Sequence, residues 1–350
     1  MTYPTEAGAR LIAISQRSFA DPDDLQTGIR GINVEYKVME RGDFHAGLLA
    51  IDTGSVLLQY GRVSLARIMR IGVPPGKFAL TGWIGSGPLP IVRGIQMLAG
   101  ELKASAPGGE TVQRNASGND TLSVMASPDQ LNCAAHALLG RPLDIRSGRI
   151  VRPSPGAAAR FLSLANRASK MVPMAGSVPP GTETTRAFTE AATRALLACL
   201  VGEEIGSRPA SMADHAKIMA RFMDAVEANL DQALYVTDLC VLVGVSARLL
   251  RQCCQEALGM SPHRFLVLRR LQLARRALTR NGRGTTSVTA VATEVGFWEL
   301  GRFAVMYRRA FGESPSVTLR RFRASSGYSN SHSPGLRHHA PTIADMSSRA

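Results

Sequence analysis

The feature that most constrains this chain is a pattern that occurs twice in its last third. Each copy predicts a short helix, a glycine turn and a second helix, because Ser or Thr at a helix start and Gly at its end satisfy the terminal backbone groups. Both copies close with the same ending, Gly259-Met260-Ser261-Pro262 and Gly312-Glu313-Ser314-Pro315. The expected helices run over 238–243, capped by Thr237, over 247–258, capped by Ser246, over 288–295, preceded by Ser287, and over 299–311. The chain therefore contains one supersecondary unit in duplicate.

The second helix of each copy carries an apolar stripe. Its members are spaced by four, which places them on one helix face: Leu250, Cys254 and Leu258 in the first copy, and Phe303, Tyr307 and Phe311 in the second. We expect this face to anchor the helix and to leave the opposite face free.

A single long helix is predicted between the copies, over 262–280. Ser261 caps it, Pro262 occupies its first turn, and Asn281-Gly282 ends it. Phe265, Leu268 and Leu271 belong to its apolar side. Such a helix would hold the two units at a fixed separation. Duplex DNA presents successive major grooves on one side about 34 Å apart, so a rigid connector would let one chain contact two of them.

Charge is concentrated in the same region. The chain has 41 Lys and Arg against 27 Asp and Glu, a net charge of +14. Residues 218–323 hold 16 of the basic and 8 of the acidic residues, so they contribute +8 in under a third of the length. This balance favours polyanionic partners, nucleic acid before anionic membrane.

Taken together, these residues resemble the AraC/XylS family of transcription regulators. The resemblance covers about 100 residues, from Leu230 to Arg323. It rests on Leu239, on Gly244-Val245-Ser246, on the run from Gly259 to Leu266, on Arg269 and Leu271, on Val291-Ala292, on Gly296-Phe297 and on Phe311-Gly312-Glu313-Ser314-Pro315. It implies that the second helix of each unit enters a major groove of promoter DNA, that the protein regulates transcription, more often by activation, and that RNA polymerase is a partner.

Matching by position implies that Ala247, Arg248, Arg251 and Gln252 face the groove in the first unit. Arginine can donate two hydrogen bonds to guanine, and glutamine pairs with adenine. The alternative is that these side chains only solvate a helix surface. The copy departs from the family at Cys254, where an aromatic residue is usual, and at Gln252, where an arginine is usual.

The second unit departs further. Its groove-facing positions would be Leu300, Gly301, Arg302 and Val305, of which only Arg302 makes strong polar contacts. Either the two apolar side chains contact thymine methyl groups, or the unit adds backbone affinity through Arg308 and Arg309. We favour the second reading. Trp298 stands where relatives have a small polar residue. It is expected to pack against the turn, and the alternative is that it reaches a sugar-phosphate edge of the DNA.

The first 201 residues predict a mostly β domain with trailing helices. Short apolar stretches broken by Gly and Pro predict strands over 32–38, 47–51, 56–60, 64–71, 78–84 and 91–97, in a β-sandwich or barrel. Helices are expected from Ser127-Pro128-Asp129, which opens the first, to Leu139, over 156–171 and over 183–201. The fold class is therefore α+β, with an all-α C-terminal domain of two helix-turn-helix units joined by a linker helix.

The expected organisation is a regulatory domain over 1–201, a linker over 202–217, a DNA-binding domain over 218–323 and a disordered tail over 324–350. The resemblance implies that the first domain senses a small-molecule effector, forms a homodimer, or both. Trp83, Phe78, Tyr60 and His45 are candidates to line a pocket, although aromatic residues in strands more often belong to the core.

Other functions have less support. No nucleotide-binding or hydrolase motif appears, and His45 and His136 stand alone, so an enzyme or repair module is the weaker alternative, with no catalytic residue, metal or cofactor expected. An architectural DNA protein without sequence preference is the second alternative. The five cysteines have no metal-ligand spacing, and those between 240 and 254 are expected to be small buried residues. Without a leader or a run of about 18 apolar residues, we expect a cytoplasmic protein with no membrane partner.

Overall fold

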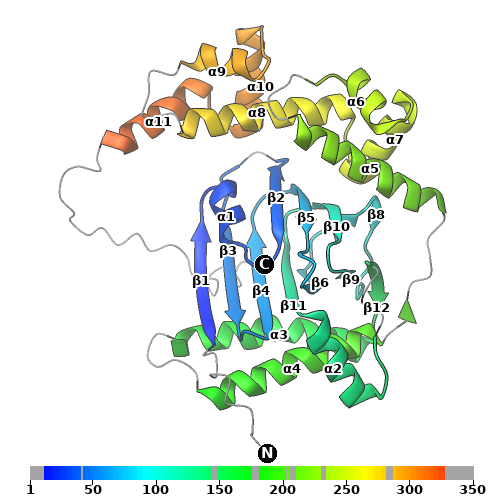
Figure 1. Ribbon diagram of the computed structural model, residues 1–350. Coiled ribbons are helices and arrows are strands. Elements are labelled where there is room, and N and C mark those ends of the chain that lie inside the picture. Colours follow the sequence, from blue (N-terminus) through cyan, green and yellow to red (C-terminus); the bar gives the residue numbers. More distant parts are fainter. Residues whose placement is uncertain are drawn as a thin grey trace, which may run out of the picture. The chain divides into compact units, whose positions relative to one another are not determined.

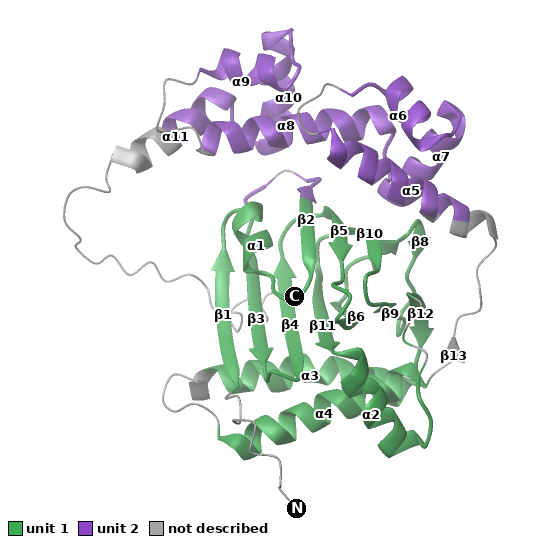
Figure 2. Ribbon diagram, viewed as in Figure 1, with its two compact units in different colours: residues 1–36, 44–212 green, residues 37–43, 213–350 purple. Residues whose placement is uncertain are grey.

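The computed structural model describes residues 12–40, 42–143, 145, 148–175, 181–201, 203–204, 210–229, 234–280 and 287–327. The chain forms two compact units, which Figure 2 distinguishes by colour. Unit 1 comprises residues 1–36 and 44–212, and unit 2 comprises residues 37–43 and 213–350.

Unit 1 is built on two antiparallel sheets (Figure 1). The eight-stranded sheet has the order β1 (Ala13–Phe19), β3 (Ala46–Asp52), β4 (Val56–Val63), β11 (Asn119–Ala126), β6 (Phe78–Gly85), β9 (Leu102–Ser105), β12 (Arg149–Arg152) and β13 (Glu203–Glu204). The five-stranded sheet has the order β2 (Asn33–Val38), β5 (Arg67–Gly72), β10 (Glu110–Asn115), β7 (Ile91–Val92) and β8 (Ile95–Gln96).

Two of the predicted strands differ from the observed ones. The stretch 91–97 forms the hairpin of β7 and β8, because Arg93 and Gly94 turn the chain with φ of 52° and 78°. The stretch 64–71 becomes a strand only from Arg67 onward. Strand β1 lies outside the region where strands were expected. It has mostly exposed or half-buried side chains and is ordered by its pairing with β3, in which Ala13 faces Asp52.

The described part of unit 1 also contains the helices α1 (Pro22–Gly28), α2 (Pro128–Leu139), α3 (Pro155–Ala175) and α4 (Thr182–Leu200). The Ser127 side chain accepts a hydrogen bond from the Gln130 amide at the start of α2, as its sequence predicts. Helix α3 packs on the eight-stranded sheet at Gly82, where a Cβ atom would lie 2.9 Å from Leu162 and 2.7 Å from Leu102. Glycine at this position lets the helix approach the strand closely.

Unit 2 is all helical in its described part apart from the end of β2. Its helices are α5 (Ala210–Ala228), α6 (Val236–Val243), α7 (Ala247–Leu258), α8 (Pro262–Arg280), α9 (Val288–Glu294), α10 (Leu300–Phe311) and α11 (Pro315–Gly327). The predicted fold class is confirmed: a mostly β N-terminal unit with trailing helices precedes an all-α unit of two helix-turn-helix units joined by α8.

The ends of unit 2 differ from the expected boundaries. Helix α5 includes residues 210–217, which the sequence assigned to the linker; the glycines and proline that suggested a linker all precede Ala210. Helix α11 begins at Pro315 and extends to Gly327, four residues into the segment expected to be a tail. The rest of that segment, 328–350, lies outside the described residues.

Candidate nucleic-acid interface

The first helix-turn-helix unit consists of α6 and α7. Gly244 ends α6 in the left-handed conformation, with φ of 73°, and its amide donates to the carbonyl of Cys240 over 3.0 Å. Ser246 then begins α7, and its Oγ accepts from the Leu249 amide over 3.3 Å. The sequence suggested Thr237 as the cap of α6, but Thr237 lies inside the helix. The helix starts at Val236, and Asp238 accepts from the Tyr235 amide over 2.9 Å.

Helix α7 has one buried and one exposed face. Leu250, Cys254 and Leu258 are fully buried, as the stripe predicts, and Cys253 lies beside them. Burial raises the pKa of the Cys254 thiol to about 12, so it behaves as a small apolar residue. The opposite face carries the four predicted contact residues, all exposed: Ala247, Arg248, Arg251 and Gln252.

The exposed side chains of α7 differ in their surroundings. Within the described part of the chain, neither Arg248 nor Arg251 has a hydrogen-bond or ion-pair partner, so both guanidinium groups are available to a ligand. Gln252 instead donates to Glu256 over 2.9 Å, and Glu256 also lies 2.7 Å from Nδ1 of His215 on α5. The hydrogen bonds from Gln252 and His215 lower the pKa of the Glu256 carboxyl. Sequence reasoning missed this network because His215 lies in the presumed linker.

The second unit consists of α9 and α10. Ser287 Oγ accepts from the Ala290 amide over 3.0 Å at the start of α9, as predicted. Gly312 ends α10 with φ of 79°. An aromatic stack replaces the aliphatic and sulfur packing of the first unit: ring centroids are 5.0 Å apart for Phe297 and Phe303, and 5.6 Å apart for Phe303 and Tyr307. Offset and edge-on aromatic pairs of this kind hold a helix in a defined orientation.

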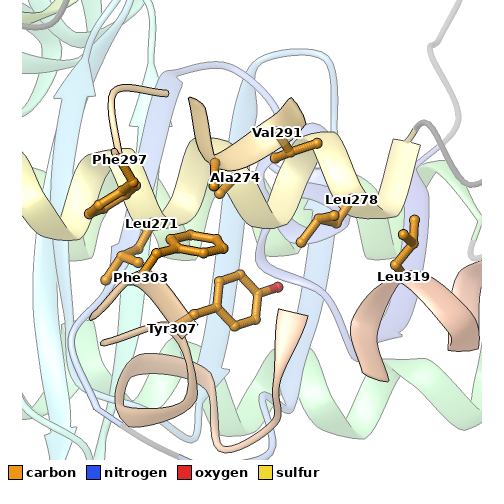
Figure 3. Packing of buried hydrophobic residues seen from close by; sticks show 9 residues of the cluster. Leu271, Ala274, Leu278, Val291, Phe297, Phe303, Tyr307 and Leu319 are labelled. Atoms are coloured by element: carbon orange, nitrogen blue, oxygen red, sulfur yellow. The ribbon is translucent and has the colours of Figure 1, made fainter. Parts of the chain in front are cut away.

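Helix α10 is anchored on the C-terminal half of α8. Leu271 and Leu278 of α8 belong to one buried cluster with Phe303 and Tyr307 of α10 (Figure 3). The Tyr307 hydroxyl donates to Oγ1 of Thr318 over 3.0 Å, which ties α10 to α11. Neither α11 nor this bond was predicted from the sequence. The repeated Ser-Pro ending, which begins the connecting helix after the first copy, was the available signal for a helix after the second.

The exposed face of α10 is mixed. Leu300 and Val305 are 41% and 52% exposed, and Gly301 and Arg302 are exposed beside them. Arg308 and Arg309 are exposed in the last turn. Trp298 is 78% exposed, so the expectation that it packs against the turn is wrong: Phe297, one residue earlier, fills that position in the core.

None of the four aromatic pocket candidates of unit 1 lines the cavity between its two sheets. Phe78, Tyr60 and Trp83 are buried in the core, and His45 is exposed. The cavity between the two sheets of unit 1 is lined by other residues, among them Arg67 and Lys103. In the part of the chain that the structure describes, no helix is long and apolar enough to span a membrane.

Two helix-turn-helix units, each with an exposed second helix, joined by one connecting helix define a double helix-turn-helix domain. The family model that matches the chain is a helix-turn-helix domain of the AraC/XylS type, over residues 239–321. The part of the chain over residues 239–321 is therefore similar to the DNA-binding domain of AraC/XylS-type transcription regulators.

Curated relatives match over the same region. The probable thc operon regulatory protein of Rhodococcus erythropolis is 42% identical over 98 residues, which are 28% of this chain and 30% of that protein. The XylDLEGF operon transcriptional activator 3 of Pseudomonas putida is 37% identical over 101 residues, 29% of this chain and 30% of that protein. The chain thus spans less than a third of these relatives. A probable AraC family regulator of known structure from Rhodopseudomonas palustris CGA009 is 38% identical, with a TM-score of 0.29, over 30% of this chain and 96% of that chain.

Proposed function

We propose that this protein is a sequence-specific transcription activator that contacts two successive major grooves with α7 and α10. The observation that carries the proposal is the pair of exposed helix faces, one anchored near each end of α8. Arg248 and Arg251 supply the base contacts of the first, and Arg302 supplies that of the second. Gln252, Ala247, Gly301, Leu300 and Val305 complete the two surfaces.

The length of α8 supports contact with two grooves. Its 19 residues correspond to about 28 Å at the helical rise of 1.5 Å per residue. This is close to the separation of about 34 Å between major grooves on one side of the duplex. Unit 2 packs α10 on the C-terminal half of α8, and α7 joins its N-terminal end through Met260 and Ser261 (Figure 1). The two recognition helices thus lie at different halves of helix α8.

The two recognition helices have different tasks in this proposal. The first presents two free guanidinium groups, which discriminate guanine by bidentate hydrogen bonds. The second presents one, Arg302, beside apolar side chains, followed by Arg308 and Arg309 in the last turn. We therefore assign most base discrimination to α7 and most phosphate contact to α10.

Activation is inferred from the names of relatives, several of which are transcriptional activators. An activator bound beside a promoter increases initiation by contacting RNA polymerase, which we propose as the protein partner. The surfaces of α7 and α10 that face DNA are not available for this contact. Because bacterial promoter DNA is the target, the proposed place of action is the cytoplasm.

The test is selection of bound duplexes from a random library by the full-length protein at physiological salt. The expected result is a motif of two blocks about one helical turn apart, of which one block has the higher information content. Selection is repeated with Arg251→Ala and Arg302→Ala, two matched losses of one arginine on the two helices. Arg251→Ala should degrade the stronger block, and Arg302→Ala the weaker one.

A motif of a single block would contradict contact with two grooves. Recovery of no motif, with binding that disappears as salt rises, would support an architectural DNA protein instead. Transcription from a promoter that carries the selected site, with purified RNA polymerase, then tests activation. A decrease on adding the protein would identify a repressor.

A further inference from the structure

Helix α7 carries a carboxylate on the face that bears its proposed base contacts. Glu256 lies four residues after Gln252, so the two side chains are neighbours on one helix surface. The Glu256 side chain is 41% exposed. A negative charge at this place repels the phosphates of a duplex that α7 contacts, and this lowers affinity. The carboxylate therefore needs a role that offsets the repulsion.

Both oxygens of the Glu256 carboxylate are engaged. Oε1 accepts a hydrogen bond from Nε2 of Gln252 over 2.9 Å, and Oε2 lies 2.7 Å from Nδ1 of His215. An ionised carboxylate only accepts, so Nδ1 of His215 carries the hydrogen in this pair. His215 belongs to α5, outside the helix-turn-helix unit, and its side chain is 21% exposed. The carboxylate is thus held from a second helix, which a pair on one helix surface alone would not be.

The same contacts keep Glu256 ionised. The hydrogen bond from Gln252 lowers the pKa of the Glu256 carboxyl, partial burial opposes this, and the hydrogen bond and charge of His215 lower it further. An ionised carboxylate has no hydrogen to donate. Glu256 therefore acts only as a hydrogen-bond acceptor near neutral pH.

This arrangement determines which atoms of Gln252 remain for a ligand. A side-chain amide has a carbonyl oxygen and an NH₂ group, and it can turn over to exchange their places. Only the nitrogen can donate to Glu256, so the reversed orientation is excluded. One N–H is used in this bond, and Oε1 and the second N–H remain. Among the described residues, none donates a hydrogen bond to Oε1 of Gln252.

One acceptor beside one donor matches one base in the major groove. Adenine presents the N6–H donor beside the N7 acceptor, whereas guanine presents two acceptors, N7 and O6. Facing guanine, the held amide would set its own Oε1 against a second acceptor. A free glutamine avoids this contact by turning its NH₂ group toward guanine. A glutamine held by Glu256 can do so only by losing that hydrogen bond.

We infer that Glu256 is a positioning residue for base recognition: held by His215, it fixes the Gln252 amide so that α7 selects an A·T pair and rejects a G·C pair. The inference deepens the proposed function and rests on it, because it specifies the base pair that one residue of α7 reads. The alternative is that the pair of Gln252 and Glu256 only stabilises the helix. Base preference would then be the same with and without Glu256.

The experiment first locates the base pair that Gln252 reads. Duplexes are selected from a random library by the full-length parent and by full-length Gln252→Ala at physiological salt. The two motifs should differ at one position of the block assigned to α7, where the parent requires A·T and the variant accepts every pair. Identical motifs, or a parent preference for a pair other than A·T at that position, would overturn the inference.

Binding to four duplexes that differ only at this position is then measured by fluorescence anisotropy. The parent should prefer A·T to G·C by at least about fivefold, and Glu256→Ala by less than about twofold. Affinity of Glu256→Ala for the A·T duplex should be retained or rise, because one negative charge is removed. An unchanged preference, with or without an equal loss of affinity for all four duplexes, would show that Glu256 has only a structural role.

Two further variants serve as controls. Glu294→Ala removes an exposed carboxylate from α9 and should leave the preference between the four duplexes unchanged. The double variant Gln252→Ala/Glu256→Ala should have the same preferences as Gln252→Ala, because a positioning residue acts only through the side chain that it positions. A preference that remains in Gln252→Ala and disappears in the double variant would mean that Glu256 contacts a base itself, and would contradict the assignment.

His215→Ala tests the contact from α5. The preference for A·T should fall between those of the parent and Glu256→Ala, because the carboxylate is then free to rotate. An unchanged preference would overturn the assignment of His215. A selected motif whose A·T preference does not depend on Glu256 would refute this inference and leave the proposed function standing. Recovery of no motif by the parent would refute both.

Discussion

At the scale of single residues, the arginines of the two recognition helices differ in their position along the helix. Arg248 and Arg251 lie on α7 near the capped helix start, whereas Arg308 and Arg309 lie in the last turn of α10. A side chain near the start of a recognition helix reaches base edges, and one near its end reaches the backbone. The position along the helix therefore separates discrimination from general affinity.

Replacement of Arg251 by alanine tests this distinction. We expect affinity for the selected duplex to fall by about 1–3 kcal/mol, and the preference at one base pair to disappear. Fluorescence anisotropy with the selected duplex and its single-base variants measures both quantities. A uniform loss across all duplexes would show that Arg251 contacts phosphate.

Lys103 provides a residue-scale prediction that needs no ligand. Burial, together with the nearby Arg93 cation, lowers its pKa to about 7 in the folded protein, below the value of 10.5 that it regains on unfolding. Between these values the unfolded chain binds the extra proton, so this residue makes the free energy of unfolding rise with pH from about 7 to 10. Below pH 7 both states are protonated, and the full cost of burying the charge is present.

Urea unfolding of unit 1, followed by Trp83 fluorescence at pH 6, 7.5 and 9, measures this effect. The comparison is between the parent and Lys103→Met, each in the Trp298→Phe background, which leaves Trp83 as the tryptophan reporter of unit 1. The difference in free energy of unfolding should move in favour of the parent as pH rises. A constant difference would mean that Lys103 keeps an ordinary pKa in the folded state.

At the scale of elements, α10 depends on its aromatic anchor more than α7 depends on any single residue. Phe303 is 1% exposed and contacts both Phe297 and Tyr307 in the cluster of Figure 3. The first unit instead distributes its burial over Leu250, Cys253 and Cys254. A substitution in this aromatic cluster should therefore disturb the packing of the second helix-turn-helix unit and leave that of the first intact.

Phe303→Ala should destabilise unit 2 by about 3–5 kcal/mol, because it opens a cavity in the cluster around α8. DNA selection with this variant should return only the block assigned to α7. Val305→Ala, two residues along on the exposed face, is the control and should change stability by less than about 0.5 kcal/mol. An unchanged two-block motif in Phe303→Ala would show that α10 is not the second recognition element.

At the scale of the whole molecule, one rigid helix sets the distance between two contact surfaces. Leu271, Ala274 and Leu278 hold the second helix-turn-helix unit, α9 and α10, on α8. Phe265 of the same helix packs against Phe222 of α5, with ring centroids 5.4 Å apart. The spacing of the DNA blocks should therefore be fixed. Flexible linkage of the units would permit several spacings.

Insertion of five base pairs between the two blocks places the second on the opposite side of the duplex. Affinity should then fall to that of a duplex with only one block, and an insertion of ten should not restore it because α8 cannot lengthen. Gel-shift titration of these duplexes measures the effect. Full affinity at the ten-base-pair insertion would indicate a flexible connection or a dimer.

The net charge of +14 gives a second prediction at this scale. Affinity should fall as salt rises, with a slope of log K against log salt of about −0.9 for each phosphate contact. Arg309→Ala should reduce the magnitude of the slope by about 1 and weaken binding to all sequences alike. An unchanged slope would remove Arg309 from the phosphate contacts.

The helix-turn-helix units could be predicted from the sequence because local interactions determine them. Ser246 and Ser287 cap the helices they precede, and Gly244, Gly259 and Gly312 adopt the left-handed conformation at helix ends. The spacing of apolar residues by four predicted that Leu250 and Phe303 are buried, and both are. Caps, glycines and helical periodicity act within a few residues, so they are readable without the fold.

Tertiary structure decided what depends on residues distant in sequence. Trp298 is exposed because Phe297 takes the buried position on α8, and no local signal ranks two adjacent aromatic residues. Arg67 and Lys103, 36 positions apart, line one cavity only because β5 and β9 belong to sheets that face each other. The sequence by itself determined the duplicated helix-turn-helix unit. Arg67 and Lys103 lie near each other only because the two sheets, whose strands are distant in the sequence, pack face to face.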